Sequence, residues 1–166
     1  MRQKYINECK IIKQNCEYTA ETHHIIAIKY KKMHLFFQII PAIITVITGS
    51  LVVTEVFPIE TLWLTIISSV IVSVSSILNP RDIYQNHLKI GKSLILLKHD
   101  ARFLYDVKSS SLNDKDFQNE VQNLHNQYNI IIETAPLTDD VSFEKARVKI
   151  KNNIHEPDKD SLGEIK

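Results

Sequence analysis

The sequence predicts an all-α membrane protein in which a two-helix transmembrane hairpin is joined to long cytoplasmic helices forming a helical stalk. Two long uncharged apolar runs lie close together, densely charged segments flank them, and apolar residues in those segments recur at heptad spacing. The 20 Lys and Arg nearly balance the 19 Asp and Glu, for a net charge of +1. Direct nucleic-acid binding is therefore not expected, since it relies on a strongly basic surface.

The first expected element is a cytoplasmic N-terminal helix, assigned to residues 1–32 and helical from about Gln3. Its seam residues recur at alternating intervals of four and three, which is typical of a helix that packs along one stripe. They are Tyr5, Cys9, Ile12, Cys16, Thr19, His23, Ile26 and Tyr30. The two cysteines are too few for a disulfide framework or a zinc site, and we expect buried thiols.

The next two elements are expected transmembrane helices over residues 33–54 and 61–80, neither of which contains a charge. A helix needs about 20 residues to cross the hydrocarbon core. The short segment 55–60 between them implies an antiparallel hairpin. Buried strands are an alternative for the β-branched stretches, but strands usually span 4–8 residues. A soluble bundle is another, but the remaining chain is too short to enclose two helices that are apolar on all sides.

Charge predicts the orientation of the hairpin. Lys29, Lys31 and Lys32 precede the first run, and Arg81 follows the second. The 55–60 loop holds two Glu and no basic residue. Because basic residues stay on the cytoplasmic side, we expect a multi-pass protein with both termini cytoplasmic and an external 55–60 loop.

Prolines predict two irregularities in these helices. Pro41 should kink the first span near Phe37. Asn79 is a suitable N-cap, with Pro80 at the first helical position and Asp82 in the first turn, so a break is expected there.

Residues 81–154 are expected to form a cytoplasmic helical region, followed by a flexible tail over 155–166. Its first helix repeats the heptad spacing at Ile83, His87, Ile90, Leu94, Leu97, Ala101 and Leu104. The lone Gly91 suits either close packing or a hinge, with packing favoured. After a polar link over 108–114, a helix capped by Asn113 or Asp114 should run to Ala135-Pro136. Its expected seam is Phe117, Val121, Leu124, Tyr128 and Ile131. A short helix over 139–154 should turn Ala146 and Ile150 inward.

Polar residues inside the spans are the main functional candidates, since they are costly in a membrane. On the second span Thr65, Ser69, Ser73 and Ser76 share one face, which Ser68 and Ser75 widen. Thr45, Thr48 and Gly49 share a side of the first span. These residues either line a water-filled pore in an oligomer or let helices pack closely, and different subunits can combine both roles.

His23 and His87 occupy seam positions on helices that are expected to face each other. Two interpretations stay open: an ordinary hydrogen-bonded core pair, or a point that responds to pH or to a metal. The sequence shows no metal-ligand spacing and no catalytic constellation, so we expect no cofactor, no metal and no enzyme activity.

The stretch ETHHIIAIKYKK before the hairpin and HLKIGKSLILLKHDARFLYDV after it resemble the SLATT family, two-transmembrane effectors associated with SMODS nucleotidyltransferases and SLOG sensor domains. The resemblance covers about residues 5–130. It implies a bacterial inner-membrane effector of anti-phage (abortive-infection) systems, which oligomerises and permeabilises the membrane when a sensor or nucleotide-signalling partner triggers it.

A different class of function remains open from the residues. The hairpin could be a membrane-anchoring scaffold whose cytoplasmic helices dock a partner protein, with the helix over 114–133 as the binding surface.

Overall fold

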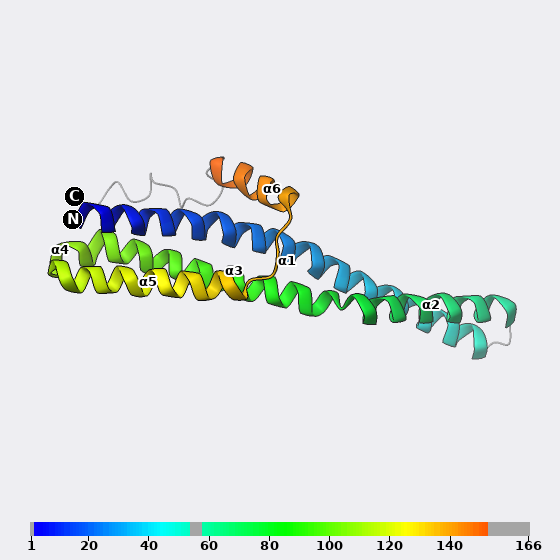
Figure 1. The fold of residues 1–166 in the computed structure, drawn as a ribbon. Coiled ribbons are helices and arrows are strands. Elements are labelled where there is room, and N and C mark those ends of the chain that lie inside the picture. Colours follow the sequence, from blue (N-terminus) through cyan, green and yellow to red (C-terminus); the bar gives the residue numbers. More distant parts are fainter. Residues whose placement is uncertain (1, 54–57, 153–166) are drawn as a thin grey trace, which may run out of the picture. The chain divides into compact units, whose positions relative to one another are not determined.

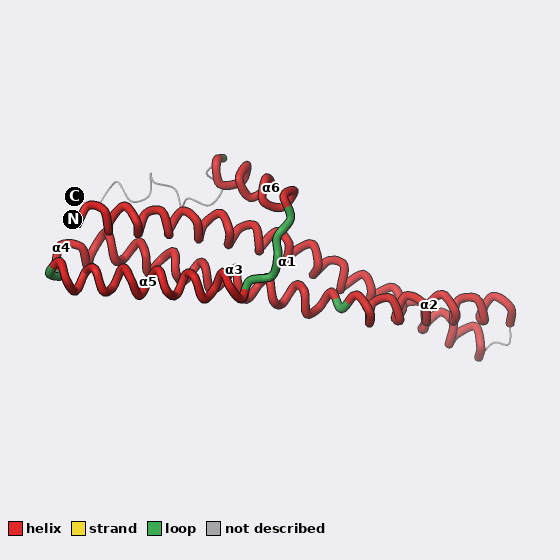
Figure 2. The backbone as a smooth tube through the Cα atoms, viewed as in Figure 1, coloured by secondary structure: helices red, strands yellow, loops and turns green. Residues whose placement is uncertain are grey.

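The computed structural model describes residues 2–53 and 58–152, and these residues form helices with no strand (Figures 1 and 2). They divide into two compact units. Of the described residues, unit 1 comprises those within Met1–Ile26 and Asn86–Lys166, and unit 2 those within Ala27–Gln85. Most of the predicted external loop, residues 55–57, and the predicted tail over 155–166 lie outside the described residues.

Helix α1 runs without interruption over Arg2–Val53, so the two helices predicted over 3–32 and 33–54 are one helix. Pro41 lies inside it. A proline removes one backbone donor, but the helix continues on both sides of this position. Thr45 also donates its hydroxyl to the Pro41 carbonyl at 2.8 Å. The kink at Pro41 stays a prediction.

Helix α2 spans Pro58–Leu78 and α3 spans Pro80–Phe103, which confirms the predicted break at Asn79. Asn79 occupies the predicted N-cap position of α3, but its backbone conformation is unusual for an N-cap. Asn79 has a φ of 41°, in the left-handed region, instead of the extended conformation of an N-cap. Its carbonyl accepts the Asp82 and Ile83 N–H groups at 3.2 and 3.4 Å, while its side-chain amide donates to the Asp82 carboxylate. Asn tolerates this conformation better than most residues.

The polar link predicted over 108–114 is shorter than expected. A short π-helix over Leu104–Lys108 follows α3, and the short helix α4 covers Ser109–Ser111. The serine hydroxyls fold back on the helix: that of Ser109 donates to the Tyr105 carbonyl at 2.6 Å and that of Ser110 to the Val107 carbonyl at 3.0 Å. Serines that bond to preceding carbonyls can continue a helix, and therefore the link is reduced to Leu112 and Asn113.

Two capped helices complete unit 1. Helix α5 spans Asp114–Thr134, and the Asn113 side chain caps it by accepting the Asp116 N–H at 2.8 Å. Helix α6 spans Asp140–Lys151 and is capped by Asp139, which accepts the Ser142 N–H at 2.8 Å. Both caps follow the usual N-cap geometry, and Ala135 ends α5 where the sequence predicted.

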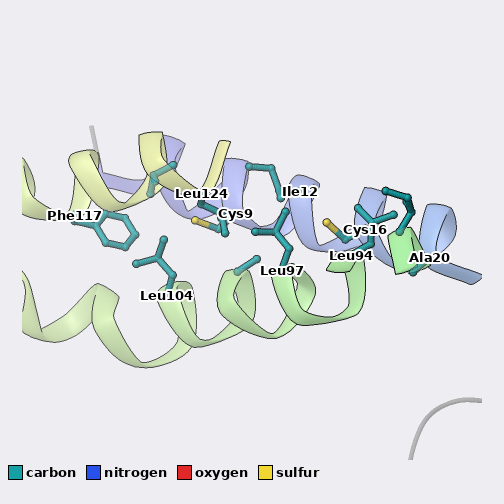
Figure 3. Close-up of a cluster of buried hydrophobic side chains, with 12 residues drawn as sticks. Cys9, Ile12, Cys16, Ala20, Leu94, Leu97, Leu104, Phe117 and Leu124 are labelled. Atoms are coloured by element: carbon teal, nitrogen blue, oxygen red, sulfur yellow. The ribbon is translucent and has the colours of Figure 1, made fainter. Parts of the chain in front are cut away.

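The core of unit 1 lies between α1, α3 and α5 (Figure 3). Its members come from the three predicted seams, joined by Ala20: Cys9, Ile12, Cys16, Ala20, Ile90, Leu94, Leu97, Ala101, Leu104, Phe117, Val121 and Leu124. Helix α6 packs on another side of α1, where the rings of Tyr18 and Phe143 lie 6.4 Å apart and Lys149 pairs with Glu21 at 2.7 Å. Ala146 is fully buried and Ile150 half-buried, as predicted.

Candidate functional site: an exposed hydroxyl stripe and a buried histidine pair

The more buried positions of unit 2 define which helix faces pack together. On α2 the least exposed residues from the predicted span recur every three or four positions: Thr61, Leu64, Ser68, Ile71 and Ser75. On α1 they include Phe37, Pro41, Ile44, Thr48 and Leu51. This spacing is that of two helices packed along one seam each. The hydroxyls of Thr48, Ser68 and Ser75 therefore belong to the packing face within one copy.

The main polar stripe lies on a different face of α2. Thr65, Ser69, Ser73 and Ser76 are all exposed in the single copy. The first three form a ladder, because Thr65 donates to the Thr61 carbonyl, Ser69 to the Thr65 carbonyl and Ser73 to the Ser69 carbonyl, each at 2.8 Å. A hydroxyl that donates to its own helix still has lone pairs to offer, so the stripe can accept hydrogen bonds from water or from another helix.

A groove runs along this stripe. It has a volume of about 340 Å³ and is bordered by larger apolar side chains, including Val70, Val74 and Ile77. The hydroxyl residues Thr65, Ser69 and Ser73 border it along one row of the helix, and the larger apolar side chains border it along the adjacent row. Small residues along a groove admit close approach of another helix.

The polar residues of α1 are divided between the two faces. Thr45 is exposed and Thr48 half-buried, and each donates its hydroxyl to the carbonyl four residues earlier at 2.8 Å. Gly49 is exposed, and a Cβ added there would meet nothing within 4 Å. The surroundings of Gly49 within one copy therefore give no reason for a glycine.

In unit 1 the structure brings the two seam histidines into direct contact. The Nδ1 atoms of His23 and His87 lie 2.8 Å apart, and the ring centroids are separated by 4.9 Å. Both residues are buried, with 1% and 4% of their surface exposed. One imidazole must donate and the other accept, so the contact is a hydrogen bond that joins α1 to α3.

The environment of the pair favours neutral rings. Burial, with a smaller contribution from the neighbouring His87, lowers the pKa of His23 to about 4. Burial also lowers the pKa of His87, against an opposing effect from the Asp139 carboxylate. Both rings are therefore uncharged at neutral pH.

The remaining predicted seam residues surround this contact. Ile90 is 8% exposed, Leu97 2% and Leu94 fully buried. Gly91 permits the close approach of α3 to α1, because a Cβ on Gly91 would lie 3.3 Å from the Ala20 carbonyl oxygen. Of the two roles predicted for Gly91, the structure thus supports close packing.

The cysteines are buried in the core, and burial raises the pKa of Cys9 to about 11 and that of Cys16 to about 12. Across residues 2–53 and 58–152 no group of three or more His, Cys, Asp or Glu side chains is arranged to hold a metal. Thiols with such pKa values are poor nucleophiles and poor metal ligands at neutral pH.

Comparison with known proteins identifies the family of the chain. The family model of the SMODS and SLOG-associating 2TM effector domain, family 4, matches residues 6–160. The chain belongs to this SLATT family. Neither the curated proteins nor the solved structures gave a match to it.

The two apolar segments of this SLATT chain fit the two-transmembrane description. The segments Arg2–Val52 and Ile59–Ser111 each contain a window long and apolar enough to cross a membrane. Only 6% and 0% of these windows are buried, whereas the core helix of a soluble protein would be mostly buried. Together with the 2TM family description, the exposed apolar windows indicate a membrane protein.

Sequence reasoning missed several residues of this SLATT chain. It did not separate Ser68 and Ser75 from the exposed stripe, although their spacing with Thr61 and Ile71 matches a seam. It also missed Arg2, whose guanidinium bonds to Asp114 at 2.7 Å and to the carbonyls of Leu112 and Ser109. The partners of Arg2 are more than 100 positions away, so no local pattern could reveal them.

Proposed function

We propose that this SLATT chain is an effector of a bacterial anti-phage system that oligomerises in the inner membrane and permeabilises or depolarises it when triggered. The family description as a 2TM effector associated with SMODS and SLOG domains supports this proposal. The observation that carries it furthest is the exposed hydroxyl stripe at Thr65, Ser69 and Ser73.

The stripe is a candidate pore lining because α2 packs against α1 through a different face within one copy. If the serines only served the contact between α1 and α2, they would lie on the seam with Ser68 and Ser75. They are instead exposed and border a groove. In an oligomer this face meets either a second copy or a central path, where hydroxyls replace part of the hydration of an ion.

The proposed topology is an antiparallel transmembrane hairpin with both termini in the cytoplasm. Exposed Lys29, Lys31 and Lys32 precede the first apolar window, and exposed Arg81 follows the second, as the positive-inside rule requires. The helices of unit 1, packed along heptad seams, would form the cytoplasmic stalk. A sensor or nucleotide-signalling protein would act on them, and no enzyme activity, cofactor or direct nucleic-acid contact is proposed.

The proposal is tested by membrane potential in bacteria that express the chain with its triggering partner or at high level. Ser73→Leu should fill the groove and suppress depolarisation. We expect Ser73→Leu to slow depolarisation by about tenfold or more. A tenfold slower rate corresponds to a barrier about 1.4 kcal/mol higher. The matched control is Val72→Leu, which adds bulk at the neighbouring position, 52% exposed and not among the residues that line the groove.

The lined-pore proposal would be contradicted if depolarisation were equal, at matched membrane levels, in the wild type, Ser73→Leu and Ser69→Leu. Loss of depolarisation in Val72→Leu as well would point to a general packing defect.

A second candidate is a membrane-anchoring scaffold, favoured by apolar side chains that unit 1 leaves exposed. Val141 and Val148 on α6 are 64% and 56% exposed, and Ile130 on α5 is 61% exposed. Such side chains outside the membrane are candidates for partner contacts. Replacing 33–80 with an unrelated hairpin separates the candidates: a scaffold keeps its function, whereas a pore loses it.

A further inference from the structure

The contact between His23 and His87 can hold one shared proton but not two. At a separation of 2.8 Å the Nδ1–H of one ring points at the Nδ1 lone pair of the other. A first added proton goes to the free Nε2 of the donor ring and leaves this hydrogen bond intact. A second must go to the acceptor Nδ1, and two N–H groups then face each other with no acceptor between them.

The doubly protonated pair would also bring two positive charges into a buried site. The seam neighbours Thr19, Ala20 and Ile26 on α1, and Ile90 and Gly91 on α3, carry no charge that could offset them. Such a site resists the second charge strongly.

Charged and titratable groups nearby offer limited compensation. Asp139, before α6, is the carboxylate that acts on His87, but both its oxygens already accept from Ser142, at 2.8 and 2.9 Å. Glu21 on α1 is paired with Lys149 of α6. His24 on α1 is half-buried. On the α5 side, burial raises the pKa of Tyr128 above its ordinary value, so this phenol is uncharged below pH 7 and cannot offset a positive charge.

A metal bridge is the less suitable occupant. Two imidazole nitrogens at about 2.0–2.1 Å from a tetrahedral metal lie roughly 3.3 Å apart, farther than the 2.8 Å between these Nδ1 atoms. In the described part of the chain no third ligand completes such a site.

We propose that the His23–His87 contact is a proton-operated latch, closed while the rings share one proton and opened, with α1 and α3 separating locally, when both rings are protonated. Opening from the neutral pair takes up two protons from solvent. The pKa of His23 is lowered to about 4, and the pKa of His87 is also lowered. The latch should therefore open only well below neutral pH. The latch lies within unit 1 and does not depend on whether the chain conducts ions.

The test uses the full chain in lipid nanodiscs, with spin labels at exposed positions Asn15 on α1 and Lys92 on α3. Distances between the labels are measured from pH 7 to pH 3.5, and ¹⁵N-histidine NMR follows the ring nitrogens. We expect a narrow distance distribution and a coupling between the two Nδ1 nuclei at pH 7. As the second ring titrates, the coupling should disappear and the distance should lengthen reversibly.

His87→Gln separates the latch from general acid unfolding, since Gln can keep one hydrogen bond but cannot become charged. It should fold at pH 7 and lose the acid-induced lengthening, and His23→Gln provides a second variant should it fail to fold. His99→Gln, on an exposed histidine of α3, should open like the wild type. The latch is refuted if the wild-type distance stays constant while both rings become protonated, or if His87→Gln opens at the same pH.

Discussion

At the scale of single residues, the surroundings of a side chain depend on which face of its helix it occupies. Ser68 and Ser69 are adjacent, yet the first is half-buried in the seam and the second is exposed on the stripe. Gly91 is likewise defined by what it faces, since its missing Cβ leaves room for the Ala20 carbonyl. A helix turns about 100° per residue, so side chains at adjacent positions face different surroundings.

The first prediction concerns Gly91. Gly91→Val should destabilise unit 1 by roughly 1–3 kcal/mol, because its Cβ would crowd the Ala20 carbonyl oxygen at 3.3 Å and its two methyl groups add further bulk against α1. Lys92→Val is the control, since it introduces the same β-branched side chain at the next, exposed position. Denaturant titration of both variants measures the difference, and equal stabilities would contradict the packing role of Gly91.

The second prediction concerns pH. His23 has a folded pKa of about 4 against an ordinary value of 6.5, so the unfolded chain takes up its proton first as the pH falls. The contribution of His23 to the free energy of unfolding is fully present above pH 6.5 and declines between pH 6.5 and about 4. Below about pH 4 it does not change further. The loss is on the order of 3 kcal/mol, at about 1.4 kcal/mol per pKa unit. Denaturation of the wild type and of His23→Gln across this range should show a steeper decline in the wild type; parallel curves would argue against it.

At the scale of elements, caps and clamps decide where helices end. The turn between α4 and α5 is held from a distant part of the chain. The Arg2 guanidinium bonds to Asp114 and to two carbonyls at this turn, and lies 5.4 Å from the centre of the Phe117 ring. Carbonyls left without helical donors at a helix end need such a partner.

The third prediction tests this clamp. Arg2→Ala should cost about 1.5–3 kcal/mol, because it removes charge-assisted hydrogen bonds and leaves the carbonyls of Ser109 and Leu112 without this donor. Hydrogen exchange should rise at residues 109–114 more than elsewhere in unit 1. Lys4→Ala, on an exposed side chain of the same helix, is the control. Unchanged exchange at the turn would mean that the clamp contributes little.

At the scale of the whole molecule, apolar surface is distributed unevenly. Unit 1 buries its seams in a core between three helices, whereas the apolar windows of α1 and α2 remain exposed. Val46 is 71% exposed and Ile77 83%. Water would penalise this much exposed apolar surface, and a bilayer removes the penalty.

The fourth prediction tests the topology through thiol labelling in intact spheroplasts. A membrane-impermeant maleimide should label Glu60→Cys from outside and should reach Lys115→Cys only after permeabilisation. The native Cys9 and Cys16 should give little background, because burial raises their pKa to about 11 and 12. Labelling of Lys115→Cys in intact cells, with Glu60→Cys protected, would reverse the proposed orientation.

The sequence alone determined the helical class, the two apolar spans, the seams of α1, α3 and α5 and the break at Asn79, and it narrowed the cap of α5 to Asn113 or Asp114. These features depend on periodicity and on neighbours within four positions, which a sequence displays directly. Only the tertiary structure decided that His23 meets His87, that Arg2 clamps the α4–α5 turn and that Ser68 packs while Ser69 is exposed. Contacts between distant segments depend on how helices rotate and approach as they bury a common core, and no local pattern specifies that rotation.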